Sequence, residues 1–169
     1  MAKNSISQDP ISRRVRRLVT TPGFAAALLA LAIPAFAAEV QFIPLQDYIG
    51  QPGVEKDPAA LGYVAERCSA LYTVFAKGLE QETDPERQKV KNQALNAGEK
   101  FMGVAVQSLR LGTTIELKDA MIRTRNIVVE VGNLYTDRIE AARVRAGDMF
   151  ADPLILGDLG VCKGLLPKL

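Results

Sequence analysis

Three Asp-Pro dipeptides divide the chain after residue 50, at Asp57-Pro58, Asp84-Pro85 and Asp152-Pro153. An aspartate before a helix accepts hydrogen bonds from the N–H groups of the first turn, and proline is favoured as the first helical residue. Each dipeptide therefore predicts the start of a helix. Three such starts constrain this part of the chain to α-helices joined by short turns.

The segments after these starts have apolar residues at spacings of three and four, which is typical of amphipathic helices. We expect helices over residues 57–80, 85–112, 113–150 and 153–166. The third opens with Thr113-Thr114-Ile115-Glu116, which fits a capping box. The segments between the Asp-Pro starts differ in length and pattern, so no internal repeat is expected. The predicted fold is an all-α, antiparallel helical bundle of three long helices and a short C-terminal helix.

The apolar stripes of these helices predict which side chains reach the core. Cys68 lies within the stripe of the first helix, whereas Arg67 and Ser69 fall largely outside it. Leu117 and Met121 belong to the stripe of the third long helix. We therefore expect Cys68, Leu117 and Met121 to face the core, and Arg67 and Ser69 to lie largely outside it.

The chain has two cysteines, Cys68 and Cys162, and both follow the predicted leader described below. An even number of cysteines in an oxidising compartment favours a disulfide, and with two cysteines its connectivity is fixed. The bond would close a loop of 94 residues, which the chain-entropy model values at about 4.5 kcal/mol. It would join the first long helix to the last.

The N-terminal segment has the three parts of a secretory signal peptide. Residues 1–23 are polar and basic, residues 24–38 are apolar, and Ala35-Phe36-Ala37 provides the small residues of a cleavage site. We expect cleavage after Ala37, which makes residues 1–37 the signal peptide, residues 38–56 an extended lead-in and residues 57–169 the helical domain. The mature protein would be periplasmic or secreted.

Two other interpretations of the leader stay open. An uncleaved segment would anchor the protein in the membrane, although the apolar run of 15 residues is shorter than the roughly 20 residues that span a bilayer. A mitochondrial presequence would also be rich in Ser and Arg and poor in acids. Contact with a membrane is expected only through an uncleaved leader.

Removal of the leader changes the charge of the protein. The whole chain has 21 basic and 19 acidic residues. Five basic residues and one acid lie in residues 1–37, so the mature chain keeps 16 and 18 and has a net charge of −2. Because the basic excess belongs to the leader, we expect no binding to nucleic acid.

Catalytic and metal-binding motifs are scarce in the sequence. The chain has no histidine, which excludes Ser–His–Asp and Cys–His nucleophiles and any zinc or haem site with a His ligand. It has no Cys-x-x-Cys and no glycine-rich phosphate loop. The paired acids, such as Glu80 with Asp84, lie near helix ends, where acids commonly act as caps. We expect no catalytic residues, no metal and no cofactor.

Three arginines form the first candidate binding site. Arg138 and Arg145 are seven residues apart and share one face of the third long helix, and Arg123 falls near the same side. Arginines at the edge of an apolar stripe bind carboxylates or phosphates well. They are candidates for contact with an anion or a partner. The alternative is pairing within the chain, with an acid such as Glu66 or Glu99.

Three tyrosines form the second candidate site. Tyr63, Tyr72 and Tyr135 could line a pocket between the helices, although aromatic residues at helical spacing more often pack in the core. These observations predict an exported, non-enzymatic helical protein that acts by binding a protein partner in the cell envelope, as an adaptor, accessory subunit or inhibitor. The alternatives are a carrier with a small ligand between its helices, or an enzyme that uses carboxylates and arginine.

Overall fold

The computed structural model describes residues 42–169, and the predicted signal peptide lies outside these residues. Within the described range, the protein is all-α, with no β-strand. The α-helices are α1 (Leu45–Ile49), α2 (Pro58–Gly78), α3 (Pro85–Gly112), α4 (Leu117–Ala146) and α5 (Pro153–Leu165). Among the short 3-10 helices, η1 (Val54–Lys56) lies between α1 and α2, η2 (Met149–Ala151) lies between α4 and α5, and η3 (Leu166–Lys168) follows α5.

The three Asp-Pro dipeptides open α2, α3 and α5, as predicted. Asp57 Oδ1 accepts a hydrogen bond from the backbone N–H of the second helical residue at 2.9 Å, and Asp84 Oδ1 accepts one from the third at 3.0 Å. Asp152 Oδ1 accepts two such bonds, at 2.9 and 3.3 Å. These bonds satisfy N–H groups that the helix itself leaves without partners.

The start of α4 differs from the prediction. The helix begins at Leu117, and its N-cap residue Glu116 makes no capping side-chain bond. The hydroxyl of Thr113 instead donates to the carbonyl oxygen of Leu109 at 2.7 Å, so this threonine closes α3. At its other end, α4 stops at Gly147, whose φ of +72° is a left-handed conformation that favours glycine. The helix is therefore shorter than predicted at both ends.

We expected an extended lead-in, but its described part, residues 42–56, contains two short helical turns. Pro44 precedes α1, and its carbonyl oxygen accepts hydrogen bonds from the N–H groups of Asp47 and Tyr48 at 3.1 Å. These local bonds fold one turn of helix, and η1 folds a second. The side chain of Leu45 is fully buried, so this segment is part of the folded domain.

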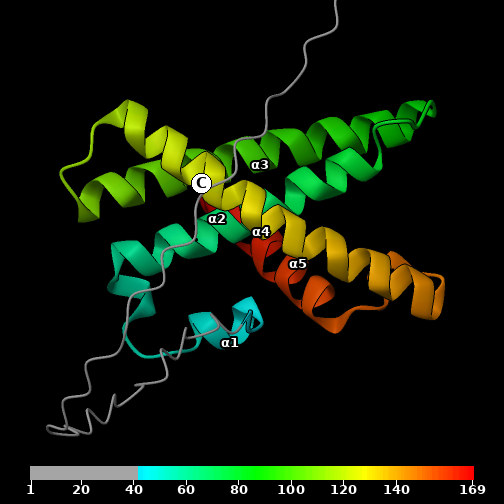
Figure 1. Ribbon diagram of the computed structural model, residues 1–169, viewed down its shortest axis with the longest axis horizontal. Helices are drawn as coiled ribbons and strands as arrows, with labels where there is room; N and C mark the ends of the chain where they lie inside the picture. Colours follow the sequence, from blue (N-terminus) through cyan, green and yellow to red (C-terminus); the bar gives the residue numbers. More distant parts are fainter. Residues whose placement is uncertain (1–41) are drawn as a thin grey trace, which may run out of the picture. The chain divides into compact units, whose positions relative to one another are not determined.

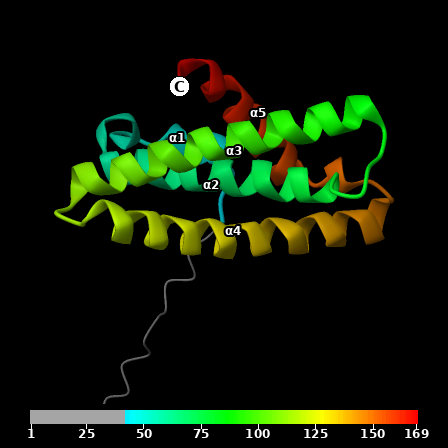
Figure 2. The ribbon, with the colours of Figure 1, turned by 90° about the horizontal axis from the view of Figure 1, so that it is seen from above.

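Helices α2 and α3 lie side by side along most of their length, joined by a short turn (Figure 1). Helix α4 crosses them obliquely in that view. Figure 2 shows α2 between α3 and α4, and α2 also contacts α5. Helix α1 packs mainly on α5. Helix α2 is therefore covered on several sides by the rest of the domain.

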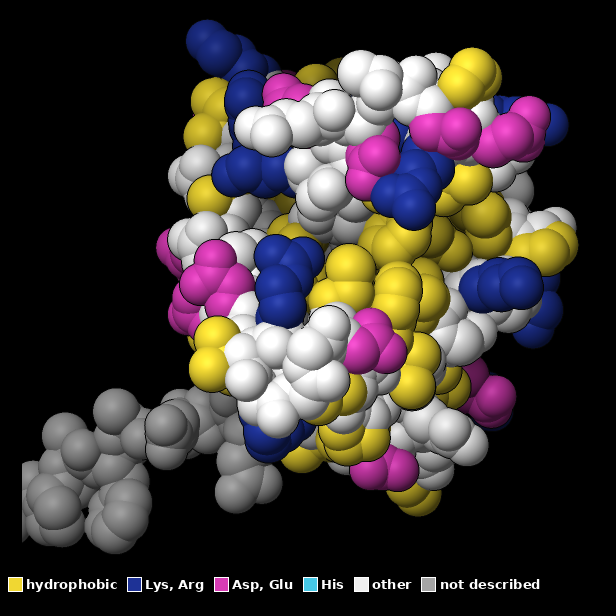
Figure 3. Space-filling view, turned by 90° about the vertical axis from the view of Figure 1, so that its right-hand side faces the viewer, with side chains coloured by type: hydrophobic (Ala, Val, Ile, Leu, Met, Phe, Trp, Pro, Cys, Tyr) yellow, Lys and Arg dark blue, Asp and Glu magenta, His cyan; other side chains and the backbone are white. Residues whose placement is uncertain are grey.

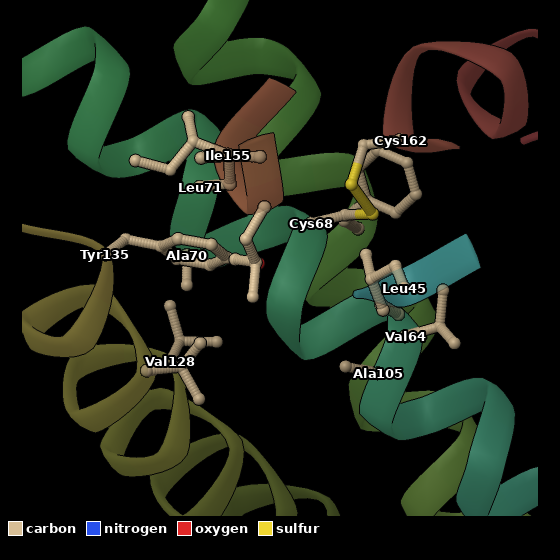
Figure 4. Close-up of a cluster of buried hydrophobic side chains, with 14 of the residues drawn as sticks. Leu45, Val64, Cys68, Ala70, Leu71, Ala105, Val128, Tyr135, Ile155 and Cys162 are labelled. Atoms are coloured by element: carbon tan, nitrogen blue, oxygen red, sulfur yellow. A yellow bond between two sulfur atoms is a disulfide. The ribbon is translucent and has the colours of Figure 1, made fainter. Parts of the chain in front are cut away.

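The hydrophobic core surrounds α2 (Figure 4). The predicted disulfide is present, with Cys68 of α2 bonded to Cys162 of α5 and their Cα atoms 5.4 Å apart. Gly98 brings α3 close to α2, since a Cβ atom at this position would lie 3.3 Å from Thr73 Oγ1. Ser69 donates a hydrogen bond to the carbonyl oxygen of Gly98 at 2.9 Å across the same contact.

The burial of Arg67 and Ser69 corrects the sequence interpretation of α2. Both were expected to lie largely outside the core-facing stripe, yet their exposed fractions are 0% and 1%. A single apolar stripe assumes that a helix is covered on one side only. Because α2 is covered by three other helices, these two polar positions are buried as well.

Candidate binding groove

An apolar groove runs along the surface between α3 and α4, beside the turn that joins them. Its volume is about 1080 Å³. Its apolar lining consists of Met102, Gly103, Val106, Leu117, Met121 and Ile122. The α4 side is open to solvent, since Leu117, Met121 and Ile122 are each about half exposed, at 49%, 55% and 50%. We call this feature the α3–α4 groove.

The groove follows from helix geometry. Its lining positions on α3 span Glu99 to Arg110 and recur at intervals of three and four residues, so they form one continuous face. Those on α4 run from Leu117 to Arg125 with similar spacing. Leu117 and Met121 were expected to face the core. They line the open groove instead.

The edges of the groove are polar and mostly basic. They carry Glu99, Gln107, Arg110, Lys118 and Arg125. All five side chains are exposed, so three positive charges stand against one negative charge around an apolar floor. The rim therefore has the opposite sign to the net charge expected for the mature chain.

Gly103 leaves part of the groove open. A Cβ atom built at this position would meet no atom of a neighbouring helix within 4 Å. Glycine in the middle of a helix is otherwise unfavourable by about 0.5–1 kcal/mol relative to alanine. The missing side chain gives a bound molecule access to the backbone of α3.

The three candidate arginines have different surroundings in the structure. Arg138 pairs with Asp152, with Nη2 2.9 Å from Oδ2, and this pairing joins α4 to the N-cap of α5. Burial tends to raise the pKa of Asp152, but its bonds to Arg138 and to backbone N–H groups outweigh burial and hold the pKa below its usual value. Arg145 is exposed near the C-terminal end of α4.

Arg123 lies close to Glu66 of α2. Burial raises the pKa of Glu66 from 4.5 to about 7, and the positive charge of Arg123 lowers it in part. Arg123 itself is exposed. Of the predicted partners, Glu66 therefore interacts with Arg123, whereas Glu99 lies on the rim of the α3–α4 groove.

Two of the three candidate tyrosines meet at Arg67, whose Nη1 and Nε donate hydrogen bonds to the hydroxyls of Tyr63 and Tyr135 at 3.2 and 3.1 Å, whereas Tyr72 lies elsewhere. Tyr72 stacks on Phe101 of α3, with ring centroids 6.0 Å apart. Tyr135 is fully buried. Tyr63 lines a smaller hollow of about 390 Å³ with Tyr48 and neighbouring residues of the lead-in. The structure thus does not gather the three around one pocket.

A buried polar network, which the sequence analysis did not identify, lies at the centre of the domain. Arg67 of α2 forms an ion pair with Asp158 of α5, and the side chains of both are 0% exposed. Tyr135 of α4 donates a hydrogen bond to Asp158 Oδ2 at 2.5 Å and accepts one from Arg67 Nε at 3.1 Å. We call these three residues the Arg67 network. It joins three helices in the core.

The Arg67 network also holds the lead-in. Arg67 Nη1 donates to the carbonyl oxygen of Ile43 at 2.5 Å, and the N–H of Leu45 donates to Asp158 Oδ1 at 2.7 Å. The guanidinium carbon of Arg67 lies 3.9 Å from the ring centroid of Phe42. Burial disfavours the charged guanidinium, but Tyr135 and Asp158 outweigh burial and raise the pKa of Arg67. The charges are thus satisfied inside the domain.

The sequence contains a signal for this network. Arg67 directly precedes Cys68, and Asp158 comes four residues before Cys162, one turn away on the same helix. The predicted disulfide therefore already placed two opposite charges near each other. Asp158 is also the only charged residue among the first ten of α5, which is unusual unless a partner lies nearby.

A second apolar area lies on the face that carries the α2–α3 and α4–η2 turns (Figure 3). Charged side chains surround it in this view. Half-buried Phe75 of α2 and Phe150 of η2 have ring centroids 6.0 Å apart in this part of the molecule. This aromatic pair joins α2 to η2, so packing within the domain accounts for these two residues.

The described residues contain no group of three or more His, Cys, Asp or Glu side chains placed to hold a metal ion. Among them, no helix is both long and apolar enough to cross a membrane.

Comparisons with protein-family models, curated proteins and solved structures found no match to this chain. The functional inference therefore depends on the geometry of residues 42–169. Its most distinctive surface is the α3–α4 groove, which offers binding through burial of apolar area.

Proposed function

We propose that this chain is an exported helical binding protein that acts through contact with a protein partner, as an adaptor, accessory subunit or inhibitor. In this proposal, α2 to α5 form an antiparallel bundle and the partner occupies the α3–α4 groove. The observation that carries it is the groove itself, about 1080 Å³ of mostly apolar space along two exposed helix faces. Contiguous apolar surfaces of this kind are typical of protein interaction sites.

Export is supported by two features. The N-terminal segment has the composition of a signal peptide, as described above. The disulfide between Cys68 and Cys162 is of the kind that persists in oxidising compartments outside the cytosol. Both features suit a protein of the periplasm or the extracellular space.

The shape of the groove favours a protein partner over a small ligand. Carriers commonly bury most of the ligand surface in a cleft or cavity. The α3–α4 groove is open along its length, and its apolar side chains on α4 remain about half exposed. The three tyrosines proposed for a carrier pocket do not line it. A carrier is therefore the weaker alternative.

The rest of the domain supports binding by holding this surface in place. The disulfide and the Arg67 network both join α2 to α5, and the network extends to α4 through Tyr135. A surface that is already ordered loses less conformational entropy when it binds. The core therefore serves to present α3 and α4 as a preformed site.

Site-specific photo-crosslinking in the cell that makes the protein tests this function. The full chain carries a photoreactive amino acid in place of Met121, within the groove. The control carries it in place of Val144, which is 89% exposed near the other end of α4. We expect a defined protein adduct from position 121 that is absent from position 144.

The variant Gly103→Leu completes the test, because its Cβ atom would enter open space and the rest of its side chain would occupy part of the groove. It should abolish the adduct at position 121 while the protein accumulates at its normal level. An adduct of equal yield at both positions, or one that Gly103→Leu leaves unchanged, would contradict the proposed function.

A further inference from the structure

Resting on the proposed function, we propose that the occupant of the α3–α4 groove is an amphipathic α-helix of the partner, with acidic residues beside its apolar stripe. The juxtaposition that carries this inference is an open apolar floor between two helices, edged by Arg110, Lys118 and Arg125. The inference names the partner's chemistry, which the proposed function leaves open.

The dimensions of the groove suit a helix. The lining positions on α3 extend from Glu99 to Arg110, which corresponds to about 16 Å at 1.5 Å per residue. This is the length of about three helical turns, enough for apolar anchors at positions i, i+3, i+4 and i+7. A helix lying there would pack against α3 and α4 as a third helix.

The open side of the groove selects an occupant with two different faces. The bound molecule keeps one side in water, so that side must be polar while the other is apolar. An amphipathic helix meets this requirement. A free acyl chain does not, since it would leave apolar surface exposed along the whole groove.

The charges at the edges select acidic flanks. Arg110 lies on the α3 side, and Lys118 and Arg125 lie on the α4 side, with Glu99 as the single opposing acid. Asp or Glu residues on both borders of an apolar stripe would meet a positive charge on either side. Such complementarity raises the association rate and disfavours partners with basic flanks.

The floor of the groove is suited to close and adaptable contact. Met102 and Met121 line it from opposite helices, and methionine side chains adjust readily to the shape of a partner. Gly103, directly after Met102 on α3, leaves room for a bulky anchor residue. These features accommodate a large apolar side chain at the centre of the partner helix.

Synthetic peptides test the inference directly. Three 14-residue peptides are used: an apolar helical stripe flanked by Glu, the same stripe flanked by Lys, and a scrambled form of the first. Binding to the protein purified after expression of the full chain is measured by fluorescence anisotropy. We expect the Glu-flanked peptide to bind about tenfold or more tightly than the Lys-flanked one at low salt, with the difference shrinking as salt rises.

Charge reversal shows whether the rim is responsible. The double variant Arg110→Glu with Arg125→Glu should bind the Lys-flanked peptide more tightly than the Glu-flanked one. A matched control, Arg143→Glu with Arg145→Glu, makes the same charge change near the C-terminal end of α4 and should keep the original preference. Gly103→Leu should weaken binding of both stripe-bearing peptides.

Four outcomes would overturn the inference. The first two are equal binding of the two flanked peptides and an unchanged preference after charge reversal at the rim. The third is tighter binding of laurate, a free acyl chain, than of any peptide. The fourth is a dimer of this chain that covers the groove and dissociates in the variant Gly103→Leu. If the crosslink at position 121 persists and still depends on Gly103 while the peptides fail, the proposed function stands and the acidic helix does not. If both the crosslink at position 121 and the peptide binding fail, neither the proposed function nor the acidic helix stands.

Discussion

The guanidinium of Arg67 and the carboxylate of Asp158 form an ion pair in the core, although the two residues lie 91 positions apart and on different helices. Neither side chain is exposed to solvent. Tyr135 bonds to both, and the backbone of the lead-in satisfies further donors and acceptors. Since a buried pair is costly to leave incomplete, these residues fix how α2, α4, α5 and the lead-in meet.

Removing one member of this pair should destabilise the domain strongly. We expect Asp158→Ala to lower the free energy of unfolding by about 3–5 kcal/mol, because an unpaired guanidinium would remain buried. The double variant Arg67→Met with Asp158→Leu should recover much of that loss, since it leaves no buried charge. Urea unfolding followed by circular dichroism measures both.

The exposed pair Arg87–Glu82 is the matched control for this experiment. Its side chains are 61% and 35% exposed, so Glu82→Gln should change the free energy of unfolding by less than about 1 kcal/mol. If Asp158→Ala were as mild as Glu82→Gln, the Arg67 network would not hold the domain together.

Stability should fall between pH 4.5 and pH 7 because of Glu66. Burial raises its pKa to about 7 in the folded protein, against 4.5 ordinarily. In this range the folded state retains a proton that the unfolded chain has lost, so the free energy of unfolding decreases as pH rises. Above pH 7 both states are ionised and this contribution levels off.

The variant Glu66→Gln should not show this fall in the free energy of unfolding between pH 4.5 and pH 7. It should be more stable than the parent at pH 8, by roughly 1–3 kcal/mol. Arg123→Gln should extend the decrease to higher pH, because Arg123 lowers the pKa of Glu66. Thermal unfolding between pH 4 and pH 9 measures these effects. An identical pH profile for Glu66→Gln and the parent would show that Glu66 does not cause the decrease.

Two glycines of α3 should respond oppositely to alanine. Gly103→Ala should stabilise the domain by about 0.5–1 kcal/mol, because the new methyl group enters open space and alanine favours the helix. Gly98→Ala should destabilise it, since its Cβ would lie 3.3 Å from Thr73 Oγ1 and 3.4 Å from the carbonyl oxygen of Ser69. Calorimetric melting temperatures compare the two, and a matching response would contradict the packing between α2 and α3.

Substitution of two of the candidate arginines should have different effects on the stability of the domain. Arg138→Gln should lower the melting temperature, because it removes the partner of Asp152 at the start of α5. The cost should be about 1 kcal/mol or less, since Arg138 is half exposed. Arg145→Gln should leave the melting temperature unchanged. Equal effects of the two substitutions would show that the pair with Asp152 contributes nothing.

The sequence predicted the features that depend on local chemistry. Asp57, Asp84 and Asp152 open helices because capping needs only a few neighbouring residues. The disulfide followed from the number of cysteines and the predicted leader. Cys68 was predicted to face the core, and it does. None of these inferences required knowledge of how the helices pack.

Features that depend on packing were missed. Arg67 looked peripheral because the stripe of a single helix does not show that α2 is covered by three others. Leu117 and Met121 looked like core residues, but whether an apolar stripe is covered depends on how α4 crosses its neighbours. The α3–α4 groove is therefore a product of tertiary arrangement, which periodicity alone does not define.

Mapping by NMR tests the central claim, that the α3–α4 groove is the binding surface, most directly. The isotope-labelled protein is titrated with the Glu-flanked peptide while the backbone amide signals are followed. We predict that the largest shifts fall within residues 99–125, in the two helix faces that line the groove, and that Gly103→Leu removes them. Shifts concentrated instead around the lead-in or the α4–η2 turn, unaffected by Gly103→Leu, would contradict this account.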